Sequence, residues 1–226
     1  ERARAIASAI HASPLLAQCL VNRGQLDADQ AGSFLAPRLR HLADPDQLPN
    51  MPAAIDRLWQ ARERDEPVVI FGDYDVDGVT ATALLLEVLQ PLGWRVTFYL
   101  PHRLDEGYGL TIEAVDRCLE RSPARLLLAV DCGSTTCDTI ARLKTRGIDV
   151  IVLDHHQVSS PPPNAVALVN PQLAPPGPDS LQQLCSVGLA FKLAHALVKR
   201  GRALGWPLAR SEERRVGKEC STRWSQ

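Results

Sequence analysis

The sequence predicts an α/β fold, a parallel five-stranded doubly wound sheet with a helical N-terminal segment. Short runs that are almost wholly apolar recur along the chain, and stretches of helical length separate them. Such alternation is typical of a parallel sheet whose two faces are both covered by helices, which makes its strands apolar throughout. The chain has 226 residues, 45% apolar and 23% charged, which is the composition of a globular protein.

The elements follow in order along the chain. Residues 1–66 are helical in composition but broken by prolines, and we interpret them as the N-terminal segment. Residues 67–210 form the expected sheet domain, and the charged segment 211–226 is expected to be a non-native or disordered tail. The expected strands are 68–71, 95–100, 126–130, 150–153 and 166–169, and the expected helices are 80–90, 111–121, 136–146 and 180–200.

Charge and cysteine content limit the possible classes of protein. The net charge of −1 gives no global basic field for nucleic acid, although a local basic groove remains compatible with it. The six cysteines form no Cys-x-x-Cys pair, which suits reduced thiols in the cytoplasm. No apolar run is long enough to span a bilayer, so we expect a cytoplasmic protein without a membrane partner.

Acidic side chains follow three of the expected strands. Because the carboxyl ends of parallel strands share one edge of a sheet, we expect these side chains to line one crevice. Several carboxylates crowded together repel one another and are costly to desolvate unless cations neutralise them. The acidic strand ends are Asp73, Asp75 and Asp77 after the first strand, Asp131 after the third, and Asp154-His155-His156 after the fourth.

Carboxylates combined with imidazoles favour Mn²⁺ or Mg²⁺. Asp131, at the centre, could bridge two ions about 3.5–4 Å apart, which would hold a phosphate and activate a water. Each acid alone has a simpler interpretation, because Asp77 could cap the following helix and Asp131 could anchor the turn at Gly133. The three clusters together favour the metal site.

The segment 101–110 follows the second strand and reaches the same edge. Arg103 could pair with a phosphate and Tyr108 could stack on a base. A turn with a solvated arginine explains the same residues equally well.

Three motifs resemble those of the DHH phosphoesterase superfamily: Asp73-Tyr74-Asp75-Val76-Asp77-Gly78, Val130-Asp131-Cys132-Gly133 and Asp154-His155-His156. Within that superfamily the chain is similar to the RecJ-like family of single-strand-specific exonucleases. The stretches that carry this narrower resemblance are 34–37, 44–51, 106–110, 169–171 and 186–192.

The resemblance implies a 5′→3′ exonuclease on single-stranded DNA, active in repair and recombination, with two Mn²⁺ or Mg²⁺ ions. It implies a single-strand-binding protein or a helicase as candidate partners. The metal ligands would be Asp75, Asp77, Asp131 and His155, with Asp73 and Asp154 as further candidates. His156 would act on the phosphate or the water beside Asp131 and His155, and Arg103, Tyr108 and Gly133 would contact the substrate.

The family's fourth motif, a further Asp after a later strand, is not found before residue 210. We therefore expect the domain to be truncated and the chain to be weakly active or inactive. Two alternatives stay open. One is a DHH-family phosphodiesterase acting on short oligoribonucleotides, cyclic dinucleotides or pyrophosphate, and the other is a non-catalytic DNA-replication scaffold.

Overall fold

The computed structural model describes residues 1–38, 42–102, 106–107, 109–175 and 181–206, so the expected tail lies outside the described residues. The chain divides into two units, residues 1–43 and the residues from Asp44 onward. In the first unit, Ala17, Leu20 and Ala31 are buried among three helices. These are α1 (Arg2–Ala9), α2 (Pro14–Asn22) and α3 (Ala28–Leu35).

No single described helix has both the length and the apolarity that a membrane span requires. Helices α1 and α2 meet these requirements only as a pair, which is bent by 118°.

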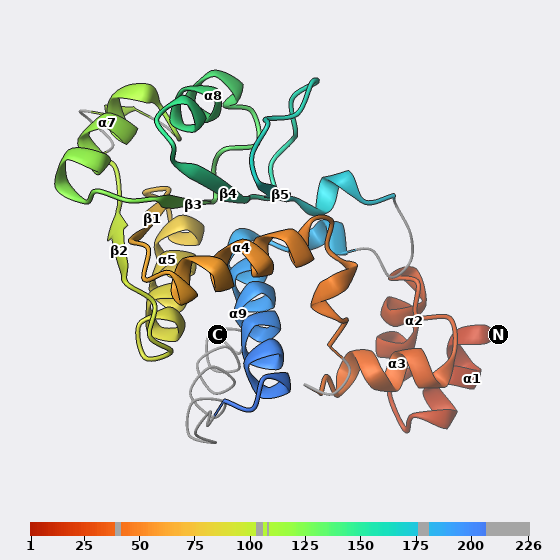
Figure 1. The fold of residues 1–226 in the computed structure, drawn as a ribbon. Helices are drawn as coiled ribbons and strands as arrows, with labels where there is room; N and C mark the ends of the chain where they lie inside the picture. The colour runs from red at the N-terminus through yellow and green to blue at the C-terminus, as the bar shows by residue number, and fades with distance from the viewer. Residues whose placement is uncertain (39–41, 103–105, 108, 176–180, 207–226) are drawn as a thin grey trace. The chain divides into compact units, whose positions relative to one another are not determined.

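A five-stranded parallel sheet forms the centre of the second unit, as the sequence predicts (Figure 1). The strand order is β2-β1-β3-β4-β5, so the first strand lies inside the sheet and the chain winds outward from it in both directions. The strands are β1 (Val68–Gly72), β2 (Val96–Tyr99), β3 (Leu126–Val130), β4 (Asp149–Leu153) and β5 (Ala167–Val169).

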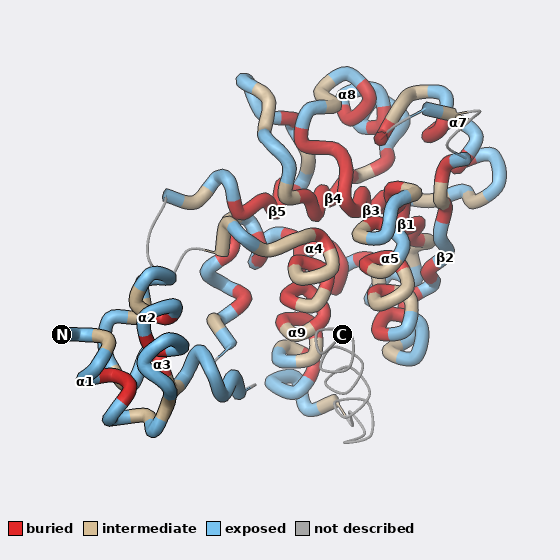
Figure 2. Tube along the Cα trace, turned by 180° about the vertical axis from the view of Figure 1, so that it is seen from behind, coloured by how far each residue is buried: buried red, intermediate tan, exposed pale blue. Residues whose placement is uncertain are grey.

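Helices cover both faces of this sheet (Figure 1). Alternate residues of each strand point to opposite faces. Ile70 and Leu128 therefore pack in the core beneath one set of helices, and Phe71 and Leu127 pack in the core beneath the other. The three central strands are buried throughout apart from the first residue of β4 (Figure 2). The first set is α4 (Met51–Glu63), α5 (Val76–Leu89) and α9 (Ser186–Ala203), and the second is α7 (Ile112–Arg121) and α8 (Cys137–Thr145).

Two helices begin at positions other than those expected. Helix α5 starts at Val76 rather than at residue 80, because the Asp75 side chain accepts a hydrogen bond from the Gly78 N–H at 3.0 Å. Asp75, and not Asp77, is therefore the cap. Helix α9 starts at Ser186, after the short 3₁₀ helix η4 (Leu181–Gln183); residue 180 lies outside the described residues. The other 3₁₀ helices among the described residues are η2 (Pro45–Gln47) and η3 (Pro171–Leu173).

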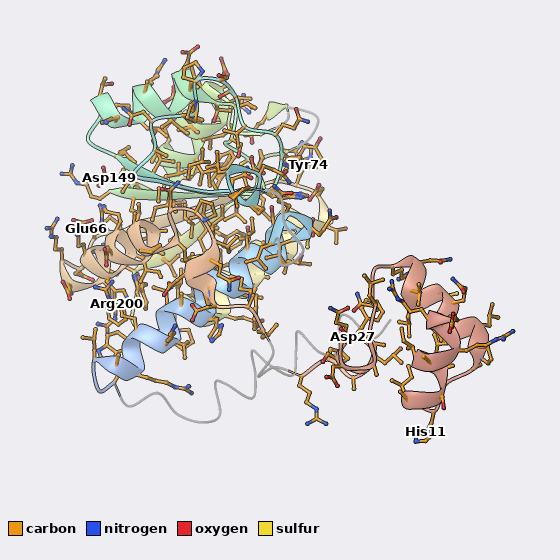
Figure 3. The ribbon with its side chains drawn as sticks, turned by 90° about the vertical axis from the view of Figure 1, so that its right-hand side faces the viewer. His11, Asp27, Glu66, Tyr74, Asp149 and Arg200 are labelled. Carbon is orange, nitrogen blue, oxygen red and sulfur yellow. The ribbon has the colours of Figure 1, made fainter. Side chains whose placement is uncertain are left out.

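Helix α4 belongs to the sheet unit, so the boundary expected at residue 66 falls within that unit. Leu58 of α4 is fully buried in the same core as β1. Arg57 binds Glu66 and Asp149, each at 2.6 Å, which ties the helix to the ends of β1 and β4 where the strands begin. Glu66 and Asp149 lie at one end of the sheet and Tyr74 lies at the other (Figure 3).

Candidate metal centre

Three neighbouring strands end side by side, and an aspartate follows each of them. Gly72 of β1 is in register with Val130 of β3, which is in register with Leu153 of β4. The next residues continue this ladder, since the Asp73 N–H donates to the Val130 carbonyl at 3.1 Å and the Asp131 N–H donates to the Leu153 carbonyl at 2.9 Å. Asp73 and Asp131 are fully buried, and Asp154 is 1% exposed. The parallel register therefore brings the three acidic motifs to one edge.

Gly78 allows the start of α5 to contact the end of β1. A Cβ atom at this position would lie 2.4 Å from the Asp73 carbonyl oxygen, closer than such atoms approach in proteins. The close approach holds Asp73 against the first turn of α5, where Asp75 is the cap and Asp77 lies one residue inside the helix. Backbone packing thus sets the spacing of the three carboxylates.

Two groups of potential ligand atoms share Asp131. The first consists of Asp73, Asp75 and Asp131, and the second of Asp131, His155 and His156; within each group the ligand atoms lie within 4.8 Å of one another. His155 Nε2 is 3.5 Å from Asp131 Oδ1 and 4.0 Å from Asp77 Oδ2. The structure thus brings together the residues that the sequence predicts from three separate strands.

Two buried carboxylate oxygens at this centre lack a hydrogen-bond donor among the described residues, Asp73 Oδ2 and Asp131 Oδ2. The other oxygen of Asp131 accepts a hydrogen bond from the Ser186 hydroxyl at 2.6 Å. An unsatisfied buried carboxylate oxygen is costly, and a divalent cation would satisfy it. Oxygen-rich ligand sets with one or two imidazoles fit Mn²⁺ or Mg²⁺.

The backbone of Asp131 is left-handed, with φ of 66°. Aspartate and asparagine adopt this conformation more readily than most other residues that carry a Cβ atom. The turn after β3 therefore constrains which residues can occupy this position.

The acidic groups of the centre perturb one another. Burial raises the pKa of Asp131 to about 7, and the adjacent carboxylates of Asp75 and Asp77 add to the rise. Burial also raises the pKa of Asp73. The pKa of Asp75 is lowered, because hydrogen bonding to the Gly78 N–H and to the Asp131 carboxyl outweighs the opposing effect of burial. Without a cation, the centre therefore favours a proton on Asp131.

Asp154 orients the two histidines. Its Oδ1 accepts from the N–H groups of His155 at 2.8 Å and His156 at 3.2 Å and lies 2.7 Å from His156 Nδ1. Its Oδ2 accepts from the Ser134 N–H at 3.1 Å. Burial would raise the pKa of Asp154, but hydrogen bonds from Ser134 and His156 outweigh it and lower the pKa. An ionised Asp154 accepts a hydrogen bond from the His156 Nδ1–H group, which leaves His156 Nε2 for other contacts.

The expectation that Asp154 is itself a metal ligand stays a prediction. Both of its oxygens accept hydrogen bonds from protein donors, and it lies outside the two ligand groups found among the described residues. Burial would lower the pKa of His156, but the hydrogen bond to Asp154 outweighs it and raises the pKa.

The expected substrate contacts are placed only in part. Gly133 is buried in the turn after Asp131 with φ of 113°, and a Cβ atom there would lie 3.1 Å from the Val152 side chain. Its carbonyl accepts a hydrogen bond from the Thr136 hydroxyl at 3.1 Å. Arg103 and Tyr108 lie outside the described residues.

Three polar residues that support the centre were not singled out from chemistry in the sequence: Ser134, Asn170 and Ser186. They are fully or almost fully buried and hydrogen-bond to the acidic motifs or to one another. Asn170 and Ser186 lie in stretches that carry the family resemblance. Otherwise the three residues share only their position, since Ser134 and Asn170 follow strands and Ser186 begins a helix at the same edge. Small neutral residues are common at such positions for reasons of turn geometry alone.

Comparisons with known proteins agree with this geometry. RecJ, the single-stranded-DNA-specific exonuclease of Bacillus subtilis, is 38% identical over 198 residues, which cover 88% of this chain and 25% of that protein. A crystal structure of RecJ from Thermus thermophilus in complex with Mn²⁺ matches 91% of the chain with a TM-score of 0.71 and 32% identity, over 28% of its own length.

A crystal structure of exonuclease RecJ bound to manganese matches 71% of the chain at 39% identity with a TM-score of 0.62, over 39% of its own length. The chain thus spans about a quarter of the length of the B. subtilis relative. The model of the DHH family, N-terminal domain, matches residues 67–215, which comprise the sheet and all three acidic motifs. The chain belongs to the DHH family.

Proposed function

We propose that the chain hydrolyses phosphodiester bonds with the help of divalent cations held at this centre, and that its substrate is single-stranded DNA degraded from the 5′ end. The observation that carries the proposal is the pair of buried carboxylate oxygens, on Asp73 and Asp131, that no described donor satisfies. The names of the relatives, single-stranded-DNA-specific exonucleases, and the manganese in solved RecJ structures support the same reaction.

The proposed ligands follow the two groups around Asp131. Asp73, Asp75 and Asp131 would hold one Mn²⁺ or Mg²⁺ ion, and Asp131 with His155, close to Asp77, would hold a second. Bound there, such ions would attract a phosphate, lower the pKa of a water and stabilise negative charge on phosphorus.

The chain's own residues position and polarise the substrate. Asp154 keeps a proton on His156 Nδ1, and the raised pKa of His156 favours a second proton on Nε2. The Nε2–H group of His156 would then donate a hydrogen bond to a phosphate oxygen. Arg103, Tyr108 and Gly133 stay candidate contacts to the 5′ phosphate and the bases.

The wider role follows from the same proposal. Degradation of single strands suits DNA repair and recombination in the cytoplasm, and a single-strand-binding protein or a helicase is the kind of partner that would supply such strands. The five described cysteines are free.

The test has two parts, metal binding and hydrolysis. Calorimetric titration with Mn²⁺ is expected to show binding that Asp131→Ala abolishes, with circular dichroism confirming that the variant is folded. A 5′-phosphorylated single-stranded oligonucleotide and a dinucleotide are then offered with Mn²⁺. We expect Mn²⁺-dependent release of mononucleotides from the oligonucleotide.

Three results would change the proposal. Absence of Mn²⁺ binding at millimolar concentration would contradict the metal centre. Faster hydrolysis of the dinucleotide would favour a phosphodiesterase of small substrates. Metal-independent DNA binding without hydrolysis would favour a scaffold.

A further inference from the structure

We propose that Asn170 is a positioning residue that fixes the His155–His156 turn against Asp131. The inference rests on the proposed function, because it assigns Asn170 a role at the same centre. Asn170 follows β5 directly, at the same edge as the acidic motifs. The Asp154 N–H donates to the Val169 carbonyl at 3.2 Å, so Asn170 lies beside the start of the histidine turn.

All hydrogen-bonding groups of the Asn170 amide are used, although its side chain is fully buried. Its Nδ2 donates to the Ser134 hydroxyl and to the His156 carbonyl, each at 2.8 Å. Its Oδ1 accepts from the Gln172 N–H at 2.8 Å. A carboxamide is a short side chain that offers two donors and an acceptor in one plane. Asn170 therefore joins three segments of chain at once.

The histidine turn is held from two sides. Asp154 accepts from the N–H groups of His155 and His156, and Asn170 donates to the His156 carbonyl. The peptide groups before and after the His156 Cα are both fixed, so the direction of its Cα–Cβ bond is fixed. The contact between Nδ1 and Asp154 then orients the ring. The following residues, 157–166, contain no helix or strand that could do this instead.

Asn170 also connects the histidine turn to the turn after Asp131. Ser134 receives the Asn170 amide on its hydroxyl and donates its N–H to Asp154 Oδ2 at 3.1 Å. The neutral side chains of Asn170 and Ser134 thereby connect the two turns and hold them in place against each other. This brace sets the 3.5 Å separation between His155 Nε2 and Asp131 Oδ1.

The test uses Asn170→Ala in the full chain, with Asn50→Ala as the matched control. The Asn50 amide also donates to a backbone carbonyl at 2.8 Å, that of Leu168 in β5, but it belongs to none of the acidic motifs. Both variants lose a hydrogen-bonded amide, one bound to β5 and one directly after it. Only Asn170→Ala is expected to weaken Mn²⁺ affinity in calorimetry, by roughly tenfold or more, as loss of a residue that orients metal ligands does.

A second measurement does not depend on metal. In the metal-free chain, a His156 Nδ1–H group bonded to Asp154, whose oxygen lies 2.7 Å from Nδ1, is expected to give a downfield proton resonance in nuclear magnetic resonance spectra. We expect this signal to broaden or disappear in Asn170→Ala and to persist in Asn50→Ala. If the wild-type chain binds no Mn²⁺, the proposed function fails, but this signal still decides the role of Asn170.

Ser134→Ala covers the case in which Asn170→Ala does not fold. It removes one of the two bonds donated by Asn170 and keeps the other, so a weaker resonance and an intermediate loss of Mn²⁺ affinity support the proposal. An unchanged resonance in a folded Asn170→Ala variant overturns it, and if that variant is unfolded, an unchanged resonance in Ser134→Ala does so.

Discussion

A single residue, Asp131, combines most of the constraints on the centre. It is fully buried, belongs to both ligand groups, and has one oxygen bound by Ser186 and one without a described donor. Burial and neighbouring carboxylates raise its pKa to about 7. A group that binds its proton more tightly when folded destabilises the fold once that proton is lost. The folded centre is therefore favoured when Asp131 carries a proton or when a cation neutralises its charge, and it is destabilised when neither is present.

We predict that the metal-free chain loses stability as pH rises from about 4 to about 7. In this window folded Asp131 keeps a proton that an unfolded aspartate, with a pKa of 3.8, has released. The raised pKa of His156 also makes the stability of the fold decrease as the pH rises. The lowered pKa values of Asp75 and Asp154 affect stability only below about pH 3.8. The loss should reach up to about 4 kcal/mol, measured by urea denaturation with a chelator present.

Asp131→Asn is the matched variant for this measurement. It keeps an oxygen for the Ser186 hydroxyl and tolerates the left-handed backbone, but it cannot ionise. The metal-free variant should be more stable than wild type at pH 8 and should lose most of the pH dependence. If the free energy of unfolding changed equally with pH in the two proteins, Asp131 would be ionised throughout this range.

Among the elements, the strands were the most predictable part of the fold. Their apolar runs are continuous, as double burial requires, and β3 spans the predicted residues 126–130. The start of α5 was missed because Asp75 was interpreted only as a ligand, whereas it is also the cap. The roles of Asn170 and Ser186 could not be predicted, since a neutral side chain reveals a role only through the partner it meets.

Helix α5 provides a prediction of its own. In Gly78→Ala the new methyl group would meet the Asp73 backbone, so α5 must move away from β1. We expect a loss of about 3 kcal/mol in the free energy of unfolding and weaker Mn²⁺ binding. Gly32→Ala in α3 is the control, because nothing lies within 4 Å of its new Cβ atom. It should be neutral or stabilising by roughly 0.5–1 kcal/mol, and similar losses in both variants would contradict this account.

Helix α4 is held at the opposite edge of the sheet. Arg57→Met leaves Glu66, whose side chain is 18% exposed, without its buried partner. We predict a loss of about 2–3 kcal/mol with unchanged Mn²⁺ affinity. Arg64→Met removes the 3.6 Å pair between an exposed arginine and the same Glu66, and should cost less than about 1 kcal/mol. A change in metal affinity in either variant would show that the two edges of the sheet are coupled.

On the scale of the whole molecule, the sheet unit contains every described residue of the candidate centre. Both large apolar cores lie within residues from Leu48 onward, and the first unit has a small core of its own. The boundary expected at residue 66 rests on the helical, proline-broken composition of residues 1–66. In the structure Pro45 begins η2 and Pro52 lies in the first turn of α4, where a proline suits the helix.

Deletion of residues 1–43 is therefore expected to leave the metal centre intact. The shortened chain, from Asp44 onward, should unfold in one cooperative transition and bind Mn²⁺ as tightly as the full chain. Calorimetry at matched pH checks both. Aggregation or a loss of affinity would show that the first unit covers apolar surface of the second.

The left-handed backbone at Asp131 has an evolutionary consequence. Few residues tolerate that conformation, and asparagine, which does, is reached from aspartate by a single nucleotide change. That change would relieve the buried charge and keep the bond to Ser186. In a duplicated gene no longer selected for the proposed hydrolysis, drift would therefore lead through a more stable protein rather than a damaged one. Descendants that keep the fold and lose the proposed chemistry are consequently one mutation away.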